Sequence, residues 1–577
     1  VTITDITGFI ANYDIGEGVV IRNCGHISTE GHTSFGNGTR VAVLNETGGR
    51  EVPIWDRLTS HMAYIITLYR HRPSAIAEIE RLIDDYAESV RSDRGEIGSG
   101  SYIAGCGTIK NVRIGNGAVI EDVSRLAEGS VNSSFRDPVY IGNDVIMDHF
   151  IICSGSKVND AAVIDKCFIG QGCTLSKQYS AENSLFFSNC GGYHGEACSI
   201  FAGPYTVTHH KSTLLIAGIF SFMNAGSGSN QSNHMYKLGP IHQGIMERGS
   251  KTTSDSYVLW PSRIGPFTLV VGRHYHNVDT TQFPFSYLTE VSYESQLIPG
   301  INLRSVGTIR DAQKWPKRDM RKDTKKLDQI NYNLLSPFTV GKMMKGRDLL
   351  KKLIDTNHGQ EVISFERMRM KTSAAERGIS LYQMGIEKFI GNSVIKRLEG
   401  AGFESDAEIR SRMKPDTDGG TGDWIDMSGL ITPLSSIEEL LASIERKELK
   451  SADAINRSFE NIHKHYYNLE WTWVYEHLPR ETGKPNEELT AADIIEIVER
   501  WKKSVVDLDR MLYEDARKEF TLSSMTGFGI DGDDEVKKRD FEQVSGDFEK
   551  NGVVLAILDH IKVKTELGDE LINRLRR

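Results

Sequence analysis

The sequence predicts a mainly β fold with added α structure, in which a parallel β-helix is joined to helical segments. Three observations predict this fold. Aliphatic residues recur every six positions through much of the first half, the apolar spacing becomes helical over residues 55–96, and helical patterns dominate from about residue 340 onward. A chain of 577 residues is also too long for one hydrophobic core, so we expect several structural units.

The β-helix prediction rests on aliphatic residues that are followed by a small or polar residue at six-residue intervals. These pairs are Ile114-Gly115 and Ile120-Glu121, Ile141-Gly142 and Met147-Asp148, Val158-Asn159 and Ile164-Asp165, and Ile169-Gly170 and Leu175-Ser176. Each hexapeptide is expected to form a short strand whose aliphatic side chain enters a triangular prism, while the small or polar residue occupies a corner. Three strands close one coil, and successive coils stack at about 4.8 Å. We expect the core of the prism to span residues 97–300.

The same pattern marks outlying coils in residues 1–54, where Ile15-Gly16 and Ile21-Arg22 repeat it. Residues 55–96 are expected to form a helical insert. Within a connector over residues 301–340, the mixed charges of Arg310–Asp328 are interpreted as a solvated segment or surface helix. Residues 341–577 are expected to form a separate α-helical domain, with a capping box at Thr490-Ala-Ala-Asp493 before its clearest helix.

The composition disfavours several classes of partner and function. The net charge of −10 argues against general attraction to nucleic acid or anionic lipid. No segment approaches the roughly 20 apolar residues of a membrane-spanning helix, and no signal peptide is visible. We therefore expect a cytoplasmic protein with reduced cysteines, whose partners are small molecules or proteins. Walker, GxSxG and HExxH motifs do not occur.

The hexapeptides quoted above resemble those of the trimeric left-handed β-helix superfamily, which includes acyltransferases and the C-terminal domains of sugar-nucleotide pyrophosphorylases. The resemblance covers residues 97–300 and implies a left-handed parallel β-helix. It also implies a homotrimer with substrates in clefts between neighbouring prisms. The nucleotidyltransferase domain of the pyrophosphorylases has no counterpart here. As a whole, the chain resembles a family of unassigned function that has this core and an appended helical domain.

In the acyltransferases of this superfamily, a histidine acts as general base toward a sugar hydroxyl or amine that attacks a thioester. The polar stretch from residue 189 to residue 276, where loops are expected to leave the prism, supplies the candidates His194, His209, His210, His234 and His242. The strand-like residues of Thr206–His210 favour His209 and His210. The alternative is that all five are ordinary corner and loop residues.

Candidate ligand-binding residues lie in the same stretch. A phosphate group would need fixed positive charge and polar contacts, for which the candidates are Arg248, Lys251, Arg273, Asn189 and Asn233. Solvated surface charge explains the cations equally well.

Two further histidine arrangements suggest other chemistry. His274 and His276 are spaced to share one face of a strand, as a divalent metal would require, although no carboxylate pair is close in sequence. Asp148 could orient the imidazole of His149, provided that a corner brings these adjacent side chains together.

The sequence leaves open whether the chain is catalytic. One hypothesis is a transferase, such as an acyltransferase, that acts on an activated sugar or related phosphorylated small molecule through a histidine base at an inter-subunit cleft. Its co-substrate would be an acyl thioester or a nucleotide sugar. The other hypothesis is a non-catalytic trimeric scaffold or regulatory protein, which binds a protein partner through exposed aromatic residues of the helical domain such as Trp471 and Trp473.

Overall fold

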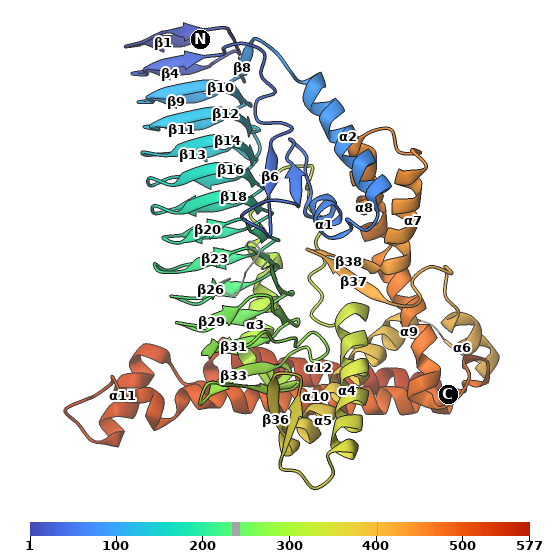
Figure 1. Ribbon diagram of the computed structural model, residues 1–577. Coiled ribbons are helices and arrows are strands. Elements are labelled where there is room, and N and C mark those ends of the chain that lie inside the picture. The colour runs from blue at the N-terminus through green and yellow to red at the C-terminus, as the bar shows by residue number, and fades with distance from the viewer. Residues whose placement is uncertain (233–242, 401, 577) are drawn as a thin grey trace.

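The computed structural model describes residues 1–577 apart from 233–242, 401 and 577, and its largest part is a parallel β-solenoid (Figure 1). One side of the prism is a continuous parallel sheet. Its strands are β1 (Thr2–Thr4), β4 (Val20–Arg22), β9 (Tyr102–Ala104), β11 (Val119–Glu121), β13 (Tyr140–Ile141), β15 (Lys157–Val158), β17 (Thr174–Ser176), β19 (Gly191–Tyr193), β22 (Val207–Thr208), β25 (Asn224–Ala225), β28 (Lys251–Thr252), β31 (Leu269–Val271) and β33 (Tyr287–Val291). Coils therefore continue from the first residues to about residue 291.

The other two sides of the prism share long strands that bend around a corner. These strands, and the shorter ones that continue them, are β2 (Ile10–Ala11), β3 (Tyr13–Ile15), β5 (His26–Ser28), β8 (Gly95–Ile97), β10 (Thr108–Ile114), β12 (Arg125–Asn132), β14 (Ile146–Cys153), β16 (Val163–Ile169), β18 (Ser180–Phe186), β20 (Glu196–Cys198), β21 (Phe201–Ala202), β23 (Leu214–Ile216), β24 (Gly218–Phe220), β26 (Asn230–Ser232), β27 (Gly244–Met246), β29 (Tyr257–Leu259), β30 (Arg263–Ile264) and β32 (Arg273–His274). The parallel β-helix predicted from the hexapeptides is confirmed.

The shared corner explains an irregularity in the repeat. In β16 the corner residue is Lys166, which adopts a left-handed conformation with φ 47°. Val163 pairs with Ser180 on the next coil, so this coil is one residue shorter than three hexapeptides. Ile164 and Ile169 are consequently five residues apart instead of six, and both still face the interior of the prism.

An excursion from the solenoid begins earlier than the sequence predicted. The coils continue through β5, which pairs with β10, and resume at β8, which pairs with β3, so residues 29–94 are inserted between β5 and β8. It contains the antiparallel hairpin β6 (Arg40–Ala42) and β7 (Glu51–Pro53), followed by the helices α1 (Ser60–Leu68) and α2 (Pro73–Ser89). The assignment of all residues 1–54 to coils is therefore wrong for this hairpin, because its buried Val41 and Val52 pack against the helices and not inside the prism.

The predicted C-terminal helical region is confirmed. Its helices are η1 (Ile301–Arg304), α3 (Val306–Lys314), η2 (Pro316–Arg318), α4 (Pro337–Thr356), α5 (Thr372–Arg397), α6 (Asp406–Met413), α7 (Leu434–Glu445), α8 (Ala452–Lys464), α9 (Tyr466–Thr482), η3 (Asn486–Glu488), α10 (Ala491–Arg517), η4 (Lys518–Phe520), η5 (Leu522–Met525), α11 (Asp534–Ser545), η6 (Phe548–Lys550) and α12 (Gly552–Leu575). Thr490 and Asp493 form the expected capping box before α10. No helix in the described part of the chain has both the length and the apolar character that a membrane crossing requires.

Three short hairpin strand pairs complete the structure. β34 (Glu294–Ile298) folds back on β33, and β35 (Val362–Phe365) pairs with β36 (Met368–Lys371) beside it, so that these strands cover the end of the solenoid. β37 (Trp424–Met427) and β38 (Leu430–Pro433) form a hairpin between the solenoid and the helices (Figure 1).

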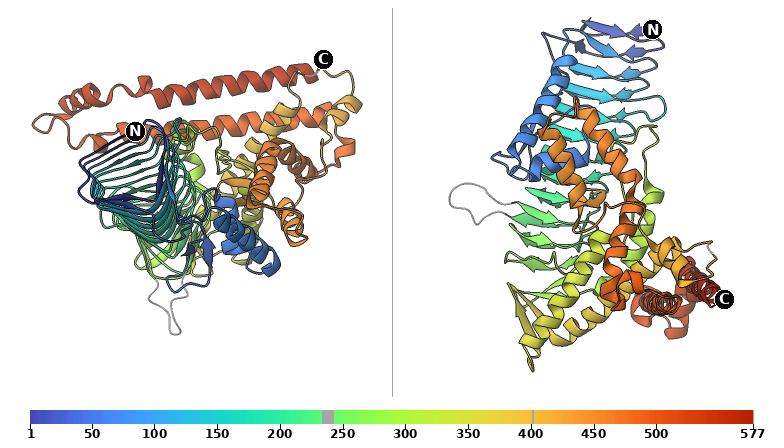
Figure 2. Two further views of the ribbon diagram at one scale, coloured as in Figure 1. Left: turned by 90° about the horizontal axis from the view of Figure 1, so that it is seen from above. Right: turned by 90° about the vertical axis from the view of Figure 1, so that its right-hand side faces the viewer.

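The helices lie along one side of the solenoid and across its C-terminal end (Figures 1 and 2). One apolar core runs from the prism interior, at Val270 and Leu288, into the helices as far as Trp501. A second core joins Phe187 on the outer surface of the solenoid to Leu441 of α7. The helical region therefore shares both cores with the solenoid, and is not packed as an independent unit.

The interpretation of Arg310–Asp328 as a solvated segment or surface helix fits the exposed Lys317 and Arg318 but is wrong for the end of the segment. Arg321 and Asp328 are buried. The carboxylate of Asp328 accepts hydrogen bonds from the backbone N–H of Ser60 (2.7 Å) and of Ser188 (2.9 Å). Arg321 is paired with Asp319 at 2.8 Å and donates to the carbonyl oxygen of Asp328. These buried charges thus pair with the protein itself, and they fix the connector to both the solenoid and the insert.

Candidate functional site

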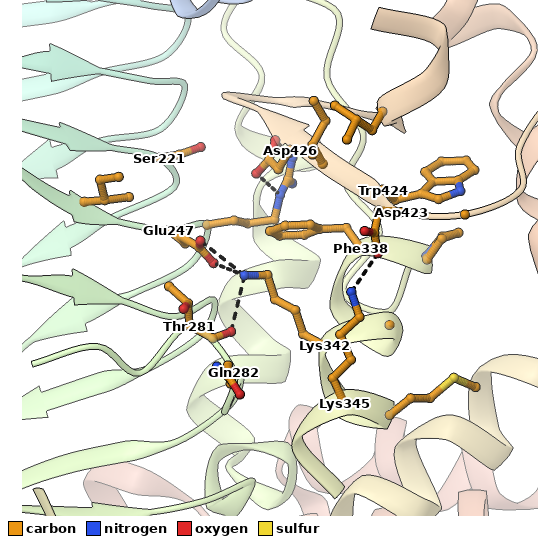
Figure 3. A pocket seen from close by; sticks show the side chains of 18 of the residues that line it. Ser221, Glu247, Thr281, Gln282, Phe338, Lys342, Lys345, Asp423, Trp424 and Asp426 are labelled. Atoms are coloured by element: carbon orange, nitrogen blue, oxygen red, sulfur yellow. Dashed lines mark hydrogen bonds and ion pairs between the residues drawn. The ribbon is translucent and has the colours of Figure 1, made fainter. Parts of the chain in front are cut away.

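A cavity of about 540 Å³ lies where the last coils of the solenoid face the helical region (Figure 3). This volume is typical of sites for small organic ligands. The residues that line it and matter for its chemistry are Tyr64 of α1, Ile219, Ile245, Glu247 and Arg263 of the solenoid, Phe338, Lys342 and Lys345 of α4, Asp423 and Trp424 of the hairpin, and Trp473 and His477 of α9. We call it the interdomain cavity.

The solenoid wall of the interdomain cavity is a ladder of outward-facing positions. Ile219 of β24 pairs with Ile245 of β27, which in turn pairs with Arg263 of β30. Because parallel strands in register place equivalent side chains above one another, two apolar side chains are followed by one guanidinium. Among the described residues, Arg263 has only long ionic contacts, each 3.9 Å, to Glu247 and Asp279. Its guanidinium is therefore the least constrained positive charge on this wall.

Ion pairs connect α4 to the opposite walls of the cavity. Lys342 Nζ lies 3.0 Å from a carboxylate oxygen of Glu247 and donates to the carbonyl oxygen of Thr281 at 3.3 Å (Figure 3). Lys345 pairs with Asp423 at 2.7 Å, and both side chains are largely exposed. Exposed pairs of this kind contribute little to stability, so Lys345 can exchange its partner for an anionic ligand at small cost.

Among the described residues that line this cavity, His477 is the histidine. Its ring stacks on Trp473 at 4.0 Å between centroids, and its Nδ1 lies 2.9 Å from the Trp473 carbonyl oxygen. Since a carbonyl oxygen only accepts hydrogen bonds, Nδ1 must carry a proton in this contact. The neutral ring then has its lone pair on Nε2, which is the arrangement that a general base requires.

Arg248, a predicted phosphate ligand, has a structural role at the back of the cavity. Its guanidinium is buried, pairs with Asp426 at 2.8 Å, and donates to the carbonyl oxygens of Asn331 (2.7 Å) and Gly429 (2.9 Å). It also lies over the ring of Phe222. These contacts join a coil of the solenoid to the β37–β38 hairpin, so the ligand-binding role predicted for Arg248 is not what its surroundings provide.

Three of the predicted catalytic histidines lie at a different place, on neighbouring coils at an outer corner of the solenoid. The ring of His209 stacks on Tyr193 at 5.6 Å with an interplanar angle of 9°, and lies 6.3 Å from His210. His194 is a corner residue with φ 58°. Burial, with a smaller effect of His210, lowers the pKa of His209. None of these three histidines lines the interdomain cavity.

The other predicted ligand contacts are bound within the protein. Lys251 pairs with Asp311, and Arg273 pairs with Asp255 at 2.5 Å on the surface. Asn189 donates to Asp319 at 3.1 Å and accepts from the backbone of Met320 at 2.9 Å. Because the coils continue through this stretch, these residues are distributed around the prism and do not gather in one loop. The remaining candidates, Asn233, His234 and His242, lie outside the described residues.

The structure places His274 and His276, the predicted metal pair, in different surroundings. β32 ends at His274, so the strand alternation that would place both rings on one face does not extend to His276. His274 is buried with its Nδ1 2.8 Å from Ser295 Oγ, whereas His276 is exposed. Burial lowers the pKa of His274 to about 4.

A different group of side chains has ligand atoms close enough to share an ion. Within the described part of the chain, this group is Asp148, His149 and Asp165. His149 is a corner residue with φ 49°, and its Nδ1 lies 2.8 Å from Asp148, as the corner hypothesis required. Asp148 also pairs with Arg125 at 2.6 Å, so part of its charge is already neutralised.

Two tryptophans of α9 are more buried than the sequence predicted. Trp471 and Trp473 were candidates for exposed partner-binding residues, but they are only 6% and 2% exposed. The spacing of Trp473 and His477, four residues apart on one helix, was the available signal for their contact. No sequence pattern connects them to Arg263 or Lys342, which lie far away along the chain.

Comparison with known proteins finds a relative of similar sequence and a solved structure that aligns with part of the chain. A relative from Treponema pallidum (strain Nichols), named "Uncharacterized protein", is 26% identical over 509 residues, which cover 81% of this chain and 68% of the relative. Among solved structures, an Arabidopsis UDP-N-acetylglucosamine acyltransferase aligns at 11% identity with 63% of this chain and 85% of its own, with a TM-score of 0.19, too low to support a functional conclusion.

Two family descriptions match consecutive parts of the chain. Residues 405–575 match "Domain of unknown function (DUF6819)", which supplies the hairpin and α9 at the interdomain cavity. Residues 1–354 match "Domain of unknown function (DUF4954)", which covers the solenoid, the insert, the connector and most of α4. Because this match spans more than half of the sequence, the chain belongs to the DUF4954 family.

Proposed function

We propose that the protein is a transferase that binds an activated sugar or related phosphorylated small molecule in the interdomain cavity, with His477 as general base. The proposal rests on the combination, in one cavity of about 540 Å³, of cations on the facing walls and a histidine whose Nε2 makes no hydrogen bond with the part of the chain that the structure describes. The co-substrate, by the resemblance noted above, would be an acyl thioester or a nucleotide sugar.

The location of the cavity supports this proposal. In the superfamily that the hexapeptides resemble, substrates lie in clefts that a neighbouring prism closes. Here the chain's own α4, hairpin and α9 face the coils at Ile219, Ile245 and Arg263. The appended helices would thus do within one chain what a second prism does elsewhere. This role accounts for the close packing of the helical region on the solenoid.

The residues divide the proposed chemistry between them. Arg263 and Lys345 would bind the phosphate oxygens, since an arginine offers paired donors and a lysine a point charge. Trp424 and Phe338 would provide flat apolar surface for a sugar or base ring. His477 Nε2 would accept the proton of the attacking hydroxyl or amine, while the Trp473 carbonyl holds the tautomer.

A screen of acyl thioesters and nucleotide sugars, first by thermal stabilisation and then by turnover, tests the proposal. With a substrate so identified, His477→Ala should lower the rate by about 10²–10⁴, the usual contribution of a general base. The matched control is His209→Ala, which changes a histidine at the outer corner and should leave the rate unchanged. Full activity of His477→Ala, or loss of activity in His209→Ala alone, would contradict the assignment.

A second candidate function, a scaffold that binds a protein partner through the helical region, has one observation in its favour. Although Trp471 and Trp473 are buried, α12 exposes Val553, Leu555 and Leu558 to solvent. This function would be favoured if the native chain binds a protein partner and the variants Leu555→Glu and Leu558→Glu do not. A failure of every compound in the screen to stabilise the chain would favour it as well.

A further inference from the structure

A second cavity, of about 340 Å³, lies inside the helical region and plays no part in the function proposed above. One wall is a single face of α5, and the others come from α3, α9, α10 and the loop before α4. The apolar lining residues are Leu303, Ile309, Leu334, Leu335, Phe389, Leu508 and Leu512. Three polar residues, Lys388, Asn392 and Lys396, follow one another at four-residue intervals along the α5 wall, and Glu470 of α9 faces them.

Lys388 marks one end of this second cavity. Its Nζ makes no hydrogen bond or ion pair with any residue that the structure describes. Burial lowers the pKa of its amine. The charge of Lys564 on α12 lowers this pKa further, whereas the carboxylate of Asp509 on α10 raises it. Asp509 is itself hydrogen-bonded to His560 at 2.6 Å. An amine in this position lacks a dedicated anionic partner, so an anion bound in the cavity would supply one.

Glu470 marks the other end. Its Oε2 is buried and has no hydrogen-bond partner in the described part of the chain. Burial raises the pKa of Glu470 to about 7, against smaller opposing effects of Tyr466 and Lys396. Lys396 lies 4.0 Å over the ring of Tyr467, next to this carboxyl group. A cation or a hydrogen-bond donor bound here would satisfy the carboxylate that burial leaves without a partner.

The two ends are too far apart to pair with each other. Lys388 and Lys396 are eight residues apart on α5, which corresponds to about 12 Å along the helix axis. Asn392 lies midway between them. Its Oδ1 accepts from Trp501 Nε1 at 3.0 Å, which leaves the side-chain N–H groups available to the cavity. From one end to the other, the cavity therefore offers a cation without an ion pair, an amide donor, and a carboxyl group beside Lys396, with apolar side chains around them.

We propose that the second cavity binds an apolar peptide of two or three residues, whose terminal carboxylate is held by Lys388 and whose terminal ammonium is held by Glu470. A tripeptide in extended conformation spans about 10 Å, which matches the separation once the reach of the two side chains is included. Asn392 donates to a peptide carbonyl in the middle. The leucines and Phe389 bury the side chains of the peptide.

Isothermal titration of the full chain with Leu-Leu-Leu tests this proposal through the two charged ends. The N-acetylated tripeptide and the tripeptide amide should each bind about ten-fold or more weakly than the free tripeptide, because each lacks one of its charges. Free leucine should bind weakly because it cannot reach both ends. Binding should also weaken about five-fold from pH 8 to pH 6, because the protonation of Glu470 outweighs the protonation of the peptide's own amine, whose pKa is about 8. The titratable neighbours of Glu470 are Lys396, Tyr466 and Tyr467.

Two variants assign each charge to its residue. Glu470→Gln should weaken the binding of the free tripeptide but not that of the N-acetylated tripeptide. Lys388→Met should weaken the binding of the free tripeptide but not that of the tripeptide amide. Glu376→Gln and Lys562→Met, exposed residues of α5 and α12, serve as controls and should leave binding unchanged. Millimolar Leu-Leu-Leu without a binding heat, or equal affinity of blocked and free peptides for the native chain, would overturn the proposal. The comparison of blocked and free peptides uses the native chain, so it tests the proposal even if a variant fails to fold.

Discussion

Arg248 and Asp426 form a buried ion pair that joins two parts of the chain far apart in sequence. Neither side chain is accessible, and the arginine also bonds to two backbone carbonyls. Removing the guanidinium would leave the Asp426 carboxylate buried without its charge partner. We therefore predict that Arg248→Met lowers the free energy of unfolding by about 3–5 kcal/mol, measured by urea denaturation.

The control for this prediction is Arg273→Met. Arg273 was an equal candidate from sequence, yet its pair with Asp255 is fully exposed. The urea midpoint should not change, since solvent screens such pairs. Equal effects of the two substitutions would show that the contacts of Arg248 do not stabilise the fold, and would reopen its candidacy as a ligand contact.

His274 makes stability depend on pH. Burial lowers its pKa to about 4 in the folded chain, compared with about 6.5 in the unfolded chain. Between these values the unfolded state binds the proton and the folded state does not, so stability is complete above pH 6.5 and falls as the pH decreases toward 4. The loss attributable to His274 should reach about 3 kcal/mol. Denaturation of the native chain and of His274→Asn at pH values from 7.5 to 4.5 measures this loss of stability. If the free energies of unfolding of the two proteins change with pH in parallel, His274 is not its cause.

At the scale of elements, the connector is expected to contribute substantially to stability. Asp328 caps backbone N–H groups of both the insert and the solenoid, so Asp328→Asn should leave poorly satisfied donors at Ser60 and Ser188. We predict a loss of about 1–3 kcal/mol in the free energy of unfolding. Asp559→Asn, on the exposed surface of α12, is the control. Unchanged stability of Asp328→Asn would mean that these contacts do not anchor the connector.

Elements with a strong internal period could be predicted from the sequence, and the contacts between elements could not. The six-residue repeat specifies coils because each hexapeptide has the same environment, and Thr490 with Asp493 specifies a helix start through local hydrogen bonds. The charges of Arg321 and Asp328 look like those of a solvated segment, since nothing local reveals the groups that they bind. The interdomain cavity likewise combines Arg263, Lys342 and His477, which only the tertiary fold brings together.

At the scale of the whole molecule, the insert and helices restrict how copies of the chain can associate. They cover one outer face of the solenoid, where Phe187 and Ile219 pack against them. Another face carries Ile146 and Val163, which pair in register and are 40% and 47% exposed. We propose that a homotrimer uses this face, and predict about three times 64.5 kDa in sedimentation equilibrium. Ile146→Glu with Val163→Glu should yield folded monomers. A native chain that sediments as a monomer would contradict the trimer.

If the chain's own solenoid and helices together form one ligand site, a bound compound must contact both of them. Hydrogen exchange, measured with and without a screened compound that stabilises the chain, tests this shared site most directly. We expect slower exchange on both sides of the interdomain cavity, in residues 245–248 of the solenoid and in residues 338–345 and 423–428 of the helical region. Slower exchange confined to residues 191–213, around Tyr193 and His209, would instead place the site at the outer corner and contradict the shared site.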